Sequence, residues 1–510
     1  MRPLRPLFSL ALALLSLGSA SAQGNPIIPG FHPDPSICRV GSDYYLVNSS
    51  FQYFPGVPIF HSTDLQRWQQ IGNVLDRQSQ LSLADATSWT GIYAPTLRYH
   101  DGTYYMITPN VQGGGNFMVT ATDPRGPWSE PIWLEQQGID PSLLFCDGKC
   151  YMVSNPDNTI TLCELDAKTG RRLTPSRGIW QGMGGRYPEG PHIYKKDGYY
   201  YLLISEGGTE LAHHITIARS RDIYGPYEAN PNNPILTHCN LKGQSSQVQG
   251  TGHGDLVQDT EGRWWLTFLA YRHYGGSYHH LGRETFIAPV EWSADGWPVV
   301  NGGEPIVPQQ RQAVSVRTDF STAPGPEWVY LQNPDSACYR LHDGRLTLTG
   351  SSSDLKTNRR PTFIGRRQEA PLFTFETKMS AGQLGSNGEA GVCAYQMHEG
   401  YASAGVSRRA GKSIVTLTLN LKNVNVPLAT RELGTATDVW LRLGSDEKNY
   451  VFSYSTDGRR YQPLGEVDCT LLSTETVGGF TGVVLGLYAH NGGSGTAKAD
   501  FDYAEYKEGE

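Results

Sequence analysis

The sequence predicts an all-β chain in which a five-bladed β-propeller is followed by a β-sandwich. The first observation is composition: the 510 residues include 58 Gly, 32 Pro and 28 Tyr, but only 7 Met. Turn formers combined with aromatic residues are typical of many short strands joined by tight turns. The second observation is a five-fold internal repeat, and the third is a change of pattern after residue 308.

Residues 1–22 have the pattern of a secretory signal peptide. A basic start precedes an apolar run over residues 7–17, and the segment ends in Ala-Ser-Ala at residues 20–22, the small-x-small pattern that signal peptidase cleaves. The apolar run is too short to span a bilayer, and no later run is long enough. We therefore expect a secreted or periplasmic protein with no membrane span.

Five segments over residues 24–310 repeat one pattern: a small or polar start, a strand, a turn and an aromatic strand. Each copy has a bulky residue three positions after its start and an aromatic residue eleven positions after it. Most copies carry Asp-Gly or Glu-Gly between the strands, which is a hairpin signal. The starts are Asp34, Ala94, Asp140, Glu189 and His253. Their spacing suits four-stranded blades, whereas the alternative of a β-sandwich would not repeat one register five times.

The repeat stops after Pro308, and the chain continues through a linker into a second domain. Stretches such as SIVTLTLNLKN and GVVLGLYAHN alternate with a period of two and end in Gly or Asn turns. This pattern predicts a β-sandwich. We assign residues 311–510 to the linker and this domain.

Ionisable residues occupy four of the five repeat starts. The innermost strand of each propeller blade lines the central channel, so equivalent positions converge on the axis. Grouping Asp34, Asp140, Glu189 and His253 there costs desolvation, and the three carboxylates repel one another. We interpret the cluster as an active site; a satisfied polar plug or a metal site is the alternative.

Three carboxylates meet the chemical requirement for cleaving a glycosidic bond. One activates a water molecule, one protonates the leaving oxygen, and a third near the acid raises the pKa of that acid. Asp34 and Asp140 share an Asp-Pro-Ser context, whereas Glu189 has the longer reach. Because they come from different blades, we expect room for a water between base and acid, and therefore inversion of configuration.

The run NPIIPGFHPDPSICRVGSDYYLVNSSFQYFPGVPIFHSTDLQRW resembles the opening of glycoside hydrolase family 43. Further matching segments are GIYAPTLRYHDGTYYM, GIDPSLLF, RYPEGPHIYKKDGYYYL, TGHGDLV and HHLGRETFIAPVEW. Members are five-bladed propeller enzymes, commonly β-xylosidases and α-L-arabinofuranosidases. The C-terminal region is similar to the concanavalin A-like (jelly-roll) sandwich of the β-xylosidase branch, so the resemblance covers nearly all of the mature chain.

The resemblance implies a role for each residue of the cluster. Asp34 corresponds to the general base, Glu189 to the general acid, and Asp140 to the carboxylate that modulates the pKa of the acid and orients it. Arg283, in Gly-Arg-Glu-Thr, corresponds to the arginine that holds sugar hydroxyls. His253 corresponds to an axial histidine that in some members binds water or calcium. A structural calcium near the axis is therefore one expectation, a hydrogen-bonded core histidine is the other, and no cofactor is required.

Five further residues are predicted to surround the sugar. By the same resemblance, Phe51, Phe117 and Thr209 match wall positions of the sugar subsite, in SSFQYF, GGGNF and EGGT. For the two phenylalanines, packing in a blade core is the alternative. Trp89 and Ile92, in TSWTGIYAP, are expected on the leaving-group side.

The predicted function is an exo-acting, inverting hydrolase that releases terminal α-L-arabinofuranose or β-D-xylose from oligosaccharides of xylan, arabinoxylan or xyloglucan. A non-catalytic sugar-binding propeller is an alternative, but it would lack at least one of the three carboxylates. A fructan- or sucrose-cleaving propeller hydrolase is another, but its Asn-Asp-Pro-Asn-like opening is replaced here by His-Pro-Asp-Pro-Ser. The net charge of −7, without a basic run, gives no support for a nucleic-acid partner.

Overall fold

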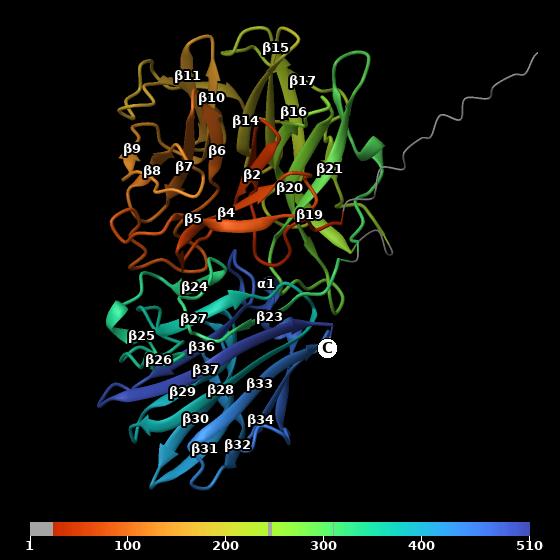
Figure 1. Ribbon diagram of the computed structural model, residues 1–510. Helices are drawn as coiled ribbons and strands as arrows, with labels where there is room; N and C mark the ends of the chain where they lie inside the picture. Colours follow the sequence, from red (N-terminus) through yellow and green to blue (C-terminus); the bar gives the residue numbers. More distant parts are fainter. Residues whose placement is uncertain (1–23, 243–246, 310, 510) are drawn as a thin grey trace, which may run out of the picture.

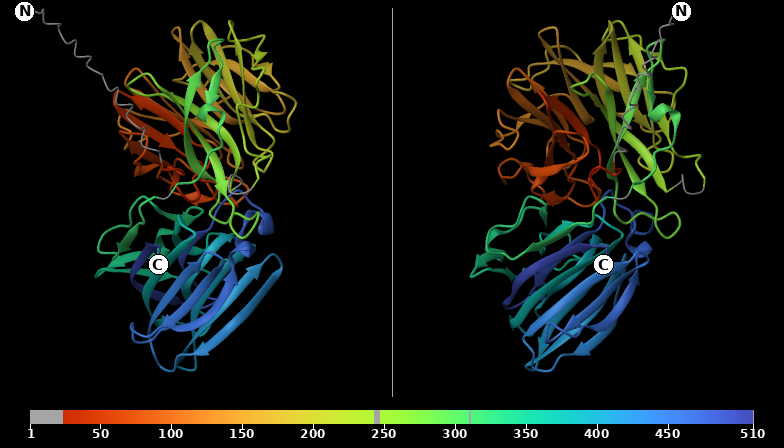
Figure 2. Two further views of the ribbon diagram at one scale, coloured as in Figure 1. Left: turned by 90° about the vertical axis from the view of Figure 1, so that its right-hand side faces the viewer. Right: turned by 45° about the vertical axis from the view of Figure 1, so that its right-hand side comes forward.

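The computed structural model describes residues 24–242, 247–309 and 311–509, which form two β-rich domains (Figure 1). The N-terminal propeller stands on the C-terminal sandwich in all three views (Figure 2). The predicted signal peptide, residues 1–22, lies outside the described residues. Within them, no helix is long and apolar enough to cross a membrane.

The propeller consists of five antiparallel sheets, as predicted. Blade one contains β1 (Ser36–Val40), β2 (Asp43–Val47), β4 (Gly56–Ser62) and β5 (Gln69–Leu75). Blade two contains β6 (Thr96–His100), β7 (Thr103–Asn110), β8 (Gly115–Ala121) and β9 (Ile132–Trp133). Blade three contains β10 (Ile139–Cys146), β11 (Lys149–Asn155), β12 (Ile160–Leu165) and β13 (Arg177–Trp180).

The last two blades complete the ring. Blade four contains β14 (Glu189–Lys196), β15 (Tyr199–Glu206), β16 (His214–Ser220), β17 (Glu228–Ala229) and β18 (Leu236–Thr237). Blade five contains β19 (Val248–Gln258), β20 (Trp264–Arg272), β21 (Glu284–Trp292) and β22 (Pro298–Val300). Each first strand contacts the first strand of the next blade, and β19 contacts β1, so the first strands enclose the axis.

Tight hairpins join the first two strands of blades two, three and four. Their turns are the Asp-Gly pairs at residues 101–102, 147–148 and 197–198, in which both residues have positive φ. This conformation is the type I′ turn, whose twist matches that of the flanking strands. The Asp-Gly signal in the sequence therefore identified these hairpins correctly.

A buried polar cluster, the axial hub, ties four blades together beneath the strand starts. Arg98 of blade two donates to both carboxylate oxygens of Asp255 of blade five, at 2.8 and 3.1 Å. The same carboxylate accepts hydrogen bonds from Ser36 Oγ of blade one (2.7 Å) and Tyr194 Oη of blade four (2.6 Å). The axial hub is a satisfied polar cluster, but it consists of residues other than the ionisable repeat starts for which a polar plug was the alternative.

The C-terminal domain is a sandwich of two antiparallel sheets. The first follows the order β25 (Tyr339–His342), β26 (Arg345–Thr349), β37 (Ala497–Glu508), β28 (Leu372–Leu384), β33 (Asp438–Asp446), β34 (Asn449–Ser455) and β35 (Gln462–Asp468), with β23 (Ser315–Thr318) also paired to β37. Apolar side chains of both sheets, including Phe375, Val392 and Leu443, form one buried core.

The second sheet crosses the boundary between the domains. It follows the order β3 (Tyr53–Phe54), β24 (Trp328–Leu331), β27 (Thr362–Arg367), β36 (Val484–His490), β29 (Glu389–Met397), β30 (Gly400–Arg409), β31 (Lys412–Leu421) and β32 (Val424–Glu432). Because β3 belongs to the propeller segment, main-chain hydrogen bonds fix one domain against the other. Short helical turns are η2 (Asn301–Gly303), η3 (Ser336–Cys338), η4 (Cys469–Leu472) and α1 (Thr474–Val477).

Candidate active site

A pocket lies on the propeller axis, where the first strands begin and the sandwich meets the propeller. Its empty space is about 400 Å³ including the open mouth. The pocket is lined by Asp34, Phe51, Tyr93, Ala94, Ile139, Asp140, Glu189, Thr209, His213, His253, Arg283 and Phe480. All five predicted repeat starts are therefore brought together.

The backbone at the repeat starts has an unusual conformation. Asp34, Asp140 and His253 have φ values of 53°, 51° and 45°, a left-handed conformation that is uncommon outside glycine. In blade four, Gly190 takes this conformation at φ 59°, and Glu189 precedes it. By hairpin register, Glu189 therefore lies one position before the equivalent of Asp34, and not at it as the repeat predicted.

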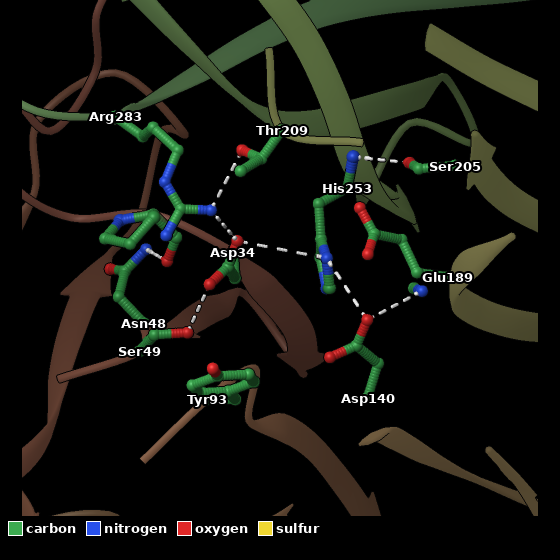
Figure 3. Close-up of polar contacts among 12 residues, drawn as sticks. Asp34, Asn48, Ser49, Tyr93, Asp140, Glu189, Ser205, Thr209, His253 and Arg283 are labelled. Atoms are coloured by element: carbon green, nitrogen blue, oxygen red, sulfur yellow. Dashed lines mark hydrogen bonds and ion pairs between the residues drawn. The ribbon is translucent and has the colours of Figure 1, made fainter. Parts of the chain in front are cut away.

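Asp34 is held as a carboxylate. Its oxygens accept hydrogen bonds from Ser49 Oγ (2.5 Å) and Arg283 Nη1 (3.2 Å), as Figure 3 shows. Burial alone would raise the pKa of Asp34, but Arg283, His253 and the Ser49 hydroxyl together lower it. An ionised, buried carboxylate suits a group that must accept a proton from water.

Asp140 is the carboxyl group whose pKa is raised. Burial raises the pKa of Asp140 well above its ordinary value, and the charges of Glu189 and Asp34 raise it further, although the Gly190 N–H donates to Oδ2 at 3.0 Å. The sequence predicted that Asp140 would keep Glu189 protonated. The structure places the raised pKa on the more buried partner, so we treat the retained proton as belonging to the Asp140–Glu189 pair.

Glu189 faces a buried histidine that the sequence analysis did not single out. His213 Nε2 lies 3.4 Å from Glu189 Oε1, while His213 Nδ1 lies 3.2 Å from the Gly250 carbonyl oxygen. Because a carbonyl oxygen only accepts, Nδ1 carries the proton in this contact. The Nε2 edge of His213 therefore faces the carboxyl group of Glu189 inside the pocket.

Arg283 joins the catalytic side of the pocket to the sandwich. Its guanidinium donates to Thr209 Oγ1 (3.1 Å) and to the Phe480 carbonyl oxygen (3.2 Å), besides Asp34. The rings of Phe51 and Phe480 each lie 5.5 Å from the guanidinium carbon. A rigid, forked donor beside the carboxylates is suited to holding hydroxyl groups.

Phe51 and Thr209 line the pocket where the resemblance placed them, and Trp89 lies beside it. The Trp89 ring is 43% exposed and packs edge-on against the ring of Phe480, with centroids 5.0 Å apart. Trp89 does not itself line the pocket, but it contacts Phe480, which does.

Phe117 and Ile92 do not line the pocket, contrary to expectation. Phe117 is fully buried on β8, the third strand outward from the axis, and packs against Trp133 in blade two. Ile92 is also fully buried, because its backbone bridges Phe51 and Asn110 and turns its side chain into the blade core. Core packing, the alternative for Phe117, is the arrangement found.

His253 occupies the centre of the site between two carboxylates. Its Nδ1 lies 3.9 Å from both Asp34 Oδ1 and Asp140 Oδ2, and its backbone N–H donates to Ser205 Oγ at 2.5 Å (Figure 3). Calcium takes six to eight oxygen ligands. Among the described residues, no three His, Cys, Asp or Glu side chains group so as to hold a metal ion. Because calcium also binds carbonyl oxygens and water, a calcium ion near His253 stays a prediction.

Four pocket residues were missed by the sequence analysis: Tyr93, Ile139, His213 and Phe480. Tyr93 directly precedes the second repeat start, so the repeat itself could have pointed to it. His213 and Phe480 lie outside the repeated segments, and Phe480 comes from the other domain. Only tertiary contacts bring these two residues to the axis.

Comparison with known proteins gives matches along both domains. The family model described as "Glycosyl hydrolases family 43" matches residues 23–298. The model described as "Beta xylosidase C-terminal Concanavalin A-like domain" matches residues 317–507. These ranges cover the propeller and the sandwich.

Two curated relatives are similar over their whole length. The "Non-reducing end alpha-L-arabinofuranosidase BoGH43B" of Bacteroides ovatus is 40% identical, over 98% of this chain and 97% of the relative. The "Xylosidase/arabinosidase" of Butyrivibrio fibrisolvens is also 40% identical, over 94% of this chain and 98% of the relative.

A solved structure extends this similarity to the fold. The structure titled "Bacteroides ovatus Xyloglucan PUL GH43B" superposes with a TM-score of 0.90 at 40% identity, covering 95% of this chain and 99% of that one. Sequence, fold and the carboxylate pocket therefore agree: the chain is a glycosidase that belongs to glycosyl hydrolase family 43, with a concanavalin A-like C-terminal domain.

Proposed function

We propose that this enzyme is an exo-acting, inverting hydrolase that removes terminal α-L-arabinofuranose or β-D-xylose from hemicellulose-derived oligosaccharides. One observation carries the proposal: a small axial pocket holds an ionised Asp34 on one side of His253 and the Asp140–Glu189 pair, with its retained proton, on the other (Figure 3). The names of the relatives, an arabinofuranosidase and a xylosidase/arabinosidase, support the choice of pentoses.

In the proposed reaction, Asp34 accepts a proton from a water molecule as that water attacks the anomeric carbon. The bond from this carbon to the leaving oxygen breaks in the same step, and Glu189 gives its proton to that oxygen. The carbon exchanges one oxygen for another on the opposite face, so its configuration inverts. Asp140 and Glu189 together retain the proton that Glu189 donates.

The pocket would recognise the sugar through shape and one cation. Arg283 presents N–H donors beside Asp34, and the rings of Phe51 and Phe480 flank its guanidinium. A hexopyranose would carry an extra hydroxymethyl group into this small space, and its hydroxyls would meet Arg283 out of place. The chain itself supplies acid, base and binding groups, so the proposal requires no cofactor.

The source of the substrate is the third part of the proposal. The structural relative is titled as part of a xyloglucan locus, and other relatives are named xylosidases, so we propose xylan, arabinoxylan or xyloglucan fragments as the source. The N-terminal pattern of residues 1–22 supports a secreted or periplasmic location, where such fragments are encountered.

Two measurements test the proposal. A panel of aryl α-L-arabinofuranosides, β-D-xylosides and hexosides should give the highest kcat/KM on a pentoside. Early-time proton NMR of the released sugar should show the inverted anomer first. A first-formed product with retained configuration would contradict the single displacement, and preference for hexosides would contradict the assigned pocket.

A further inference from the structure

Two residues before Glu189, an exposed aromatic side chain adopts an unfavourable backbone conformation. Tyr187 is 56% exposed and has a φ of 52°. A bulky L-residue is a conformational outlier in this region, where Gly or Asn is far easier to place. The exposed ring gains little from burial in return, and such strain is concentrated at functional sites.

The ring of Tyr187 lies next to a loop that lines the pocket. A Cβ atom placed on Gly208 would lie 3.1 Å from Cδ2 of Tyr187, so the ring passes directly over this glycine. The next residue, Thr209, lines the pocket and holds Arg283. Tyr187 therefore lies against the loop that carries Thr209 into the pocket, and it precedes Glu189 by two residues.

A buried carboxylate fixes the loop that carries Tyr187. Glu206 is fully buried, and it accepts hydrogen bonds from the backbone N–H groups of Met183 (2.9 Å) and Gly185 (2.8 Å) and from Thr216 Oγ1 (2.8 Å). The Arg186 carbonyl oxygen also accepts from the Gly207 N–H at 2.7 Å. The loop is thus preorganised, which lowers the entropic cost of binding a ligand there.

One face of the ring is already occupied. The Arg186 guanidinium carbon lies 5.4 Å from the Tyr187 ring centroid. Arg186 is itself held by an ion pair with Glu210 at 3.2 Å. Two further apolar side chains on the joined loops, Met183 and Leu211, are 53% and 51% exposed.

We propose that Tyr187, on the loop next to Gly208, forms the binding site for the leaving-group sugar, here called the leaving-group platform. Glu189 protonates the leaving oxygen, so the departing sugar lies on the Glu189 side of the pocket. The apolar C–H face of a pyranose ring matches an exposed aromatic face. This inference rests on the proposed function and adds to it that the enzyme recognises the second sugar of an oligosaccharide.

The decisive comparison uses substrates with and without a leaving-group sugar. We would measure kcat and KM for a pentosyl fluoride, whose leaving group is a single atom, and for the matching pentose-terminated di- and trisaccharides. Tyr187→Asn removes the ring and tolerates positive φ, so the loop keeps its conformation. Tyr99→Asn is the matched control, because Tyr99 is 40% exposed but lies five residues along the chain from pocket residue Ala94.

We expect Tyr187→Asn to lower kcat/KM on the oligosaccharides roughly three- to tenfold, mainly through a higher KM, and to leave the fluoride within twofold of wild type. Tyr187→Phe should retain wild-type values on both substrates, and Tyr99→Asn should change neither. Equal losses on fluoride and oligosaccharide, or no loss on either, would overturn the platform.

Two other outcomes distinguish a failure of the leaving-group platform from a failure of the proposed function. A wild-type enzyme inactive on every pentoside would overturn the proposed function and the platform with it. The second outcome is an active wild type that elutes as a dimer, while Tyr187→Asn elutes as a monomer with unchanged kinetics. In that case the surface around Tyr187 binds a second copy of the chain, and only the leaving-group platform is overturned.

Discussion

At the scale of single residues, the site works because neighbouring groups shift the pKa values of its carboxyl groups in opposite directions. Arg283, His253 and the Ser49 hydroxyl stabilise the charged form of Asp34, whereas burial next to other carboxylates opposes ionisation of Asp140. The Asp140–Glu189 pair can therefore retain the proton that Glu189 donates at a pH where the base Asp34 is ionised.

The first prediction concerns Asp34 and Glu189. We expect Asp34→Asn and Glu189→Gln each to lower kcat by roughly 10²–10⁴-fold, because each keeps side-chain size but removes the proton chemistry. Circular dichroism should remain that of the wild type. Aryl pentosides of differing leaving-group pKa test the roles: Glu189→Gln should lose least on the best leaving groups, whereas an equal loss on good and poor ones would remove Glu189 from the acid role.

The second prediction concerns the pH profile and Asp140. At high pH, activity falls when the Asp140–Glu189 pair loses its last proton, and the pKa of Asp140 is raised by burial and by its carboxylate neighbours. With Asp140→Asn, Glu189 no longer has that negative neighbour, so it ionises at lower pH. The alkaline limb of kcat/KM should therefore move to lower pH, with reduced activity.

A matched control for this measurement is Asp147→Asn on the hairpin of the same blade. Asp147 is exposed and pairs with Lys195 at 2.7 Å, away from the axis. Its variant should reproduce the wild-type profile. A lower kcat with an unchanged alkaline limb in Asp140→Asn would leave Asp140 with a purely orienting role.

At the scale of strands and blades, the axial hub holds the first strands in register beneath the pocket. Asp255 is fully buried and receives hydrogen bonds from three other blades. Blade three joins separately, through a hydrogen bond from Ser142 Oγ to the Pro191 carbonyl oxygen at 2.6 Å. The catalytic residues begin these same strands, so the hub sets their spacing.

The third prediction is that Asp255→Asn destabilises the protein by about 3–5 kcal/mol, because it leaves the Arg98 cation, whose side chain is only 18% exposed, without a counter-charge. Equilibrium unfolding in urea, followed by tryptophan fluorescence, measures this change. Asp43→Asn is the control: its pair with His61 is partly exposed and is worth only about 0–1 kcal/mol. A loss as small as that of the control would remove the hub from the blade-joining role.

The same variant has a definite pH dependence. Burial would raise the pKa of Asp255, but Arg98, His192 and the hydrogen bonds from Arg98 and Tyr194 hold it far below its ordinary value. A lowered pKa in the folded state stabilises the protein above the unfolded pKa of about 3.9 and loses that effect as pH falls toward the folded pKa. The difference between wild type and Asp255→Asn should be constant from pH 5 to 8 and shrink below about pH 4.

At the scale of the whole molecule, the sandwich completes the pocket. Phe480 lines it and packs against Phe51 and Trp89, and its carbonyl oxygen binds Arg283. Nearby, Glu475 accepts from the backbone N–H of His279 at 2.9 Å. The two domains therefore form one binding site, and neither contains all of its groups.

The fourth prediction is that Phe480→Ala lowers kcat/KM on pentosides by roughly tenfold while leaving the propeller folded. The loss of ring contacts widens the pocket and exposes Arg283 to water, so hydroxyl groups are held less well. Val424→Ala, an exposed position on β32 of the sandwich, is the control and should be neutral. Wild-type kinetics for Phe480→Ala would show that the sandwich ring takes no part in binding.

The fifth prediction is the product pattern. A small pocket bounded by both domains admits a terminal sugar, whereas an internal backbone unit requires an open groove. Chromatography of digests of xylo- and arabino-oligosaccharides should show free pentose from the first minutes. Early release of di- and trisaccharides from a long polymer would demonstrate endo action and contradict the exo assignment.

The sequence by itself determined the features that repeat or depend on local chemistry. Five copies of a hairpin pattern were sufficient to predict five blades, because each Asp-Gly turn and each alternating strand is specified within a few residues. The same repeat brought Asp34, Asp140 and Glu189 to one axis. It placed Glu189 one residue from its true register, because Gly190, and not Glu189, takes the left-handed conformation.

Only the tertiary structure decided what depends on contacts between distant segments. Phe480 and His213 reach the pocket through domain packing and loop folding, and no local pattern marks either residue. Phe117 and Ile92 match pocket motifs in sequence, yet they face blade cores because strand order and side-chain alternation turn them inward. Which carboxyl group has the raised pKa also followed from burial and neighbouring charge, quantities that exist only once the chain has folded.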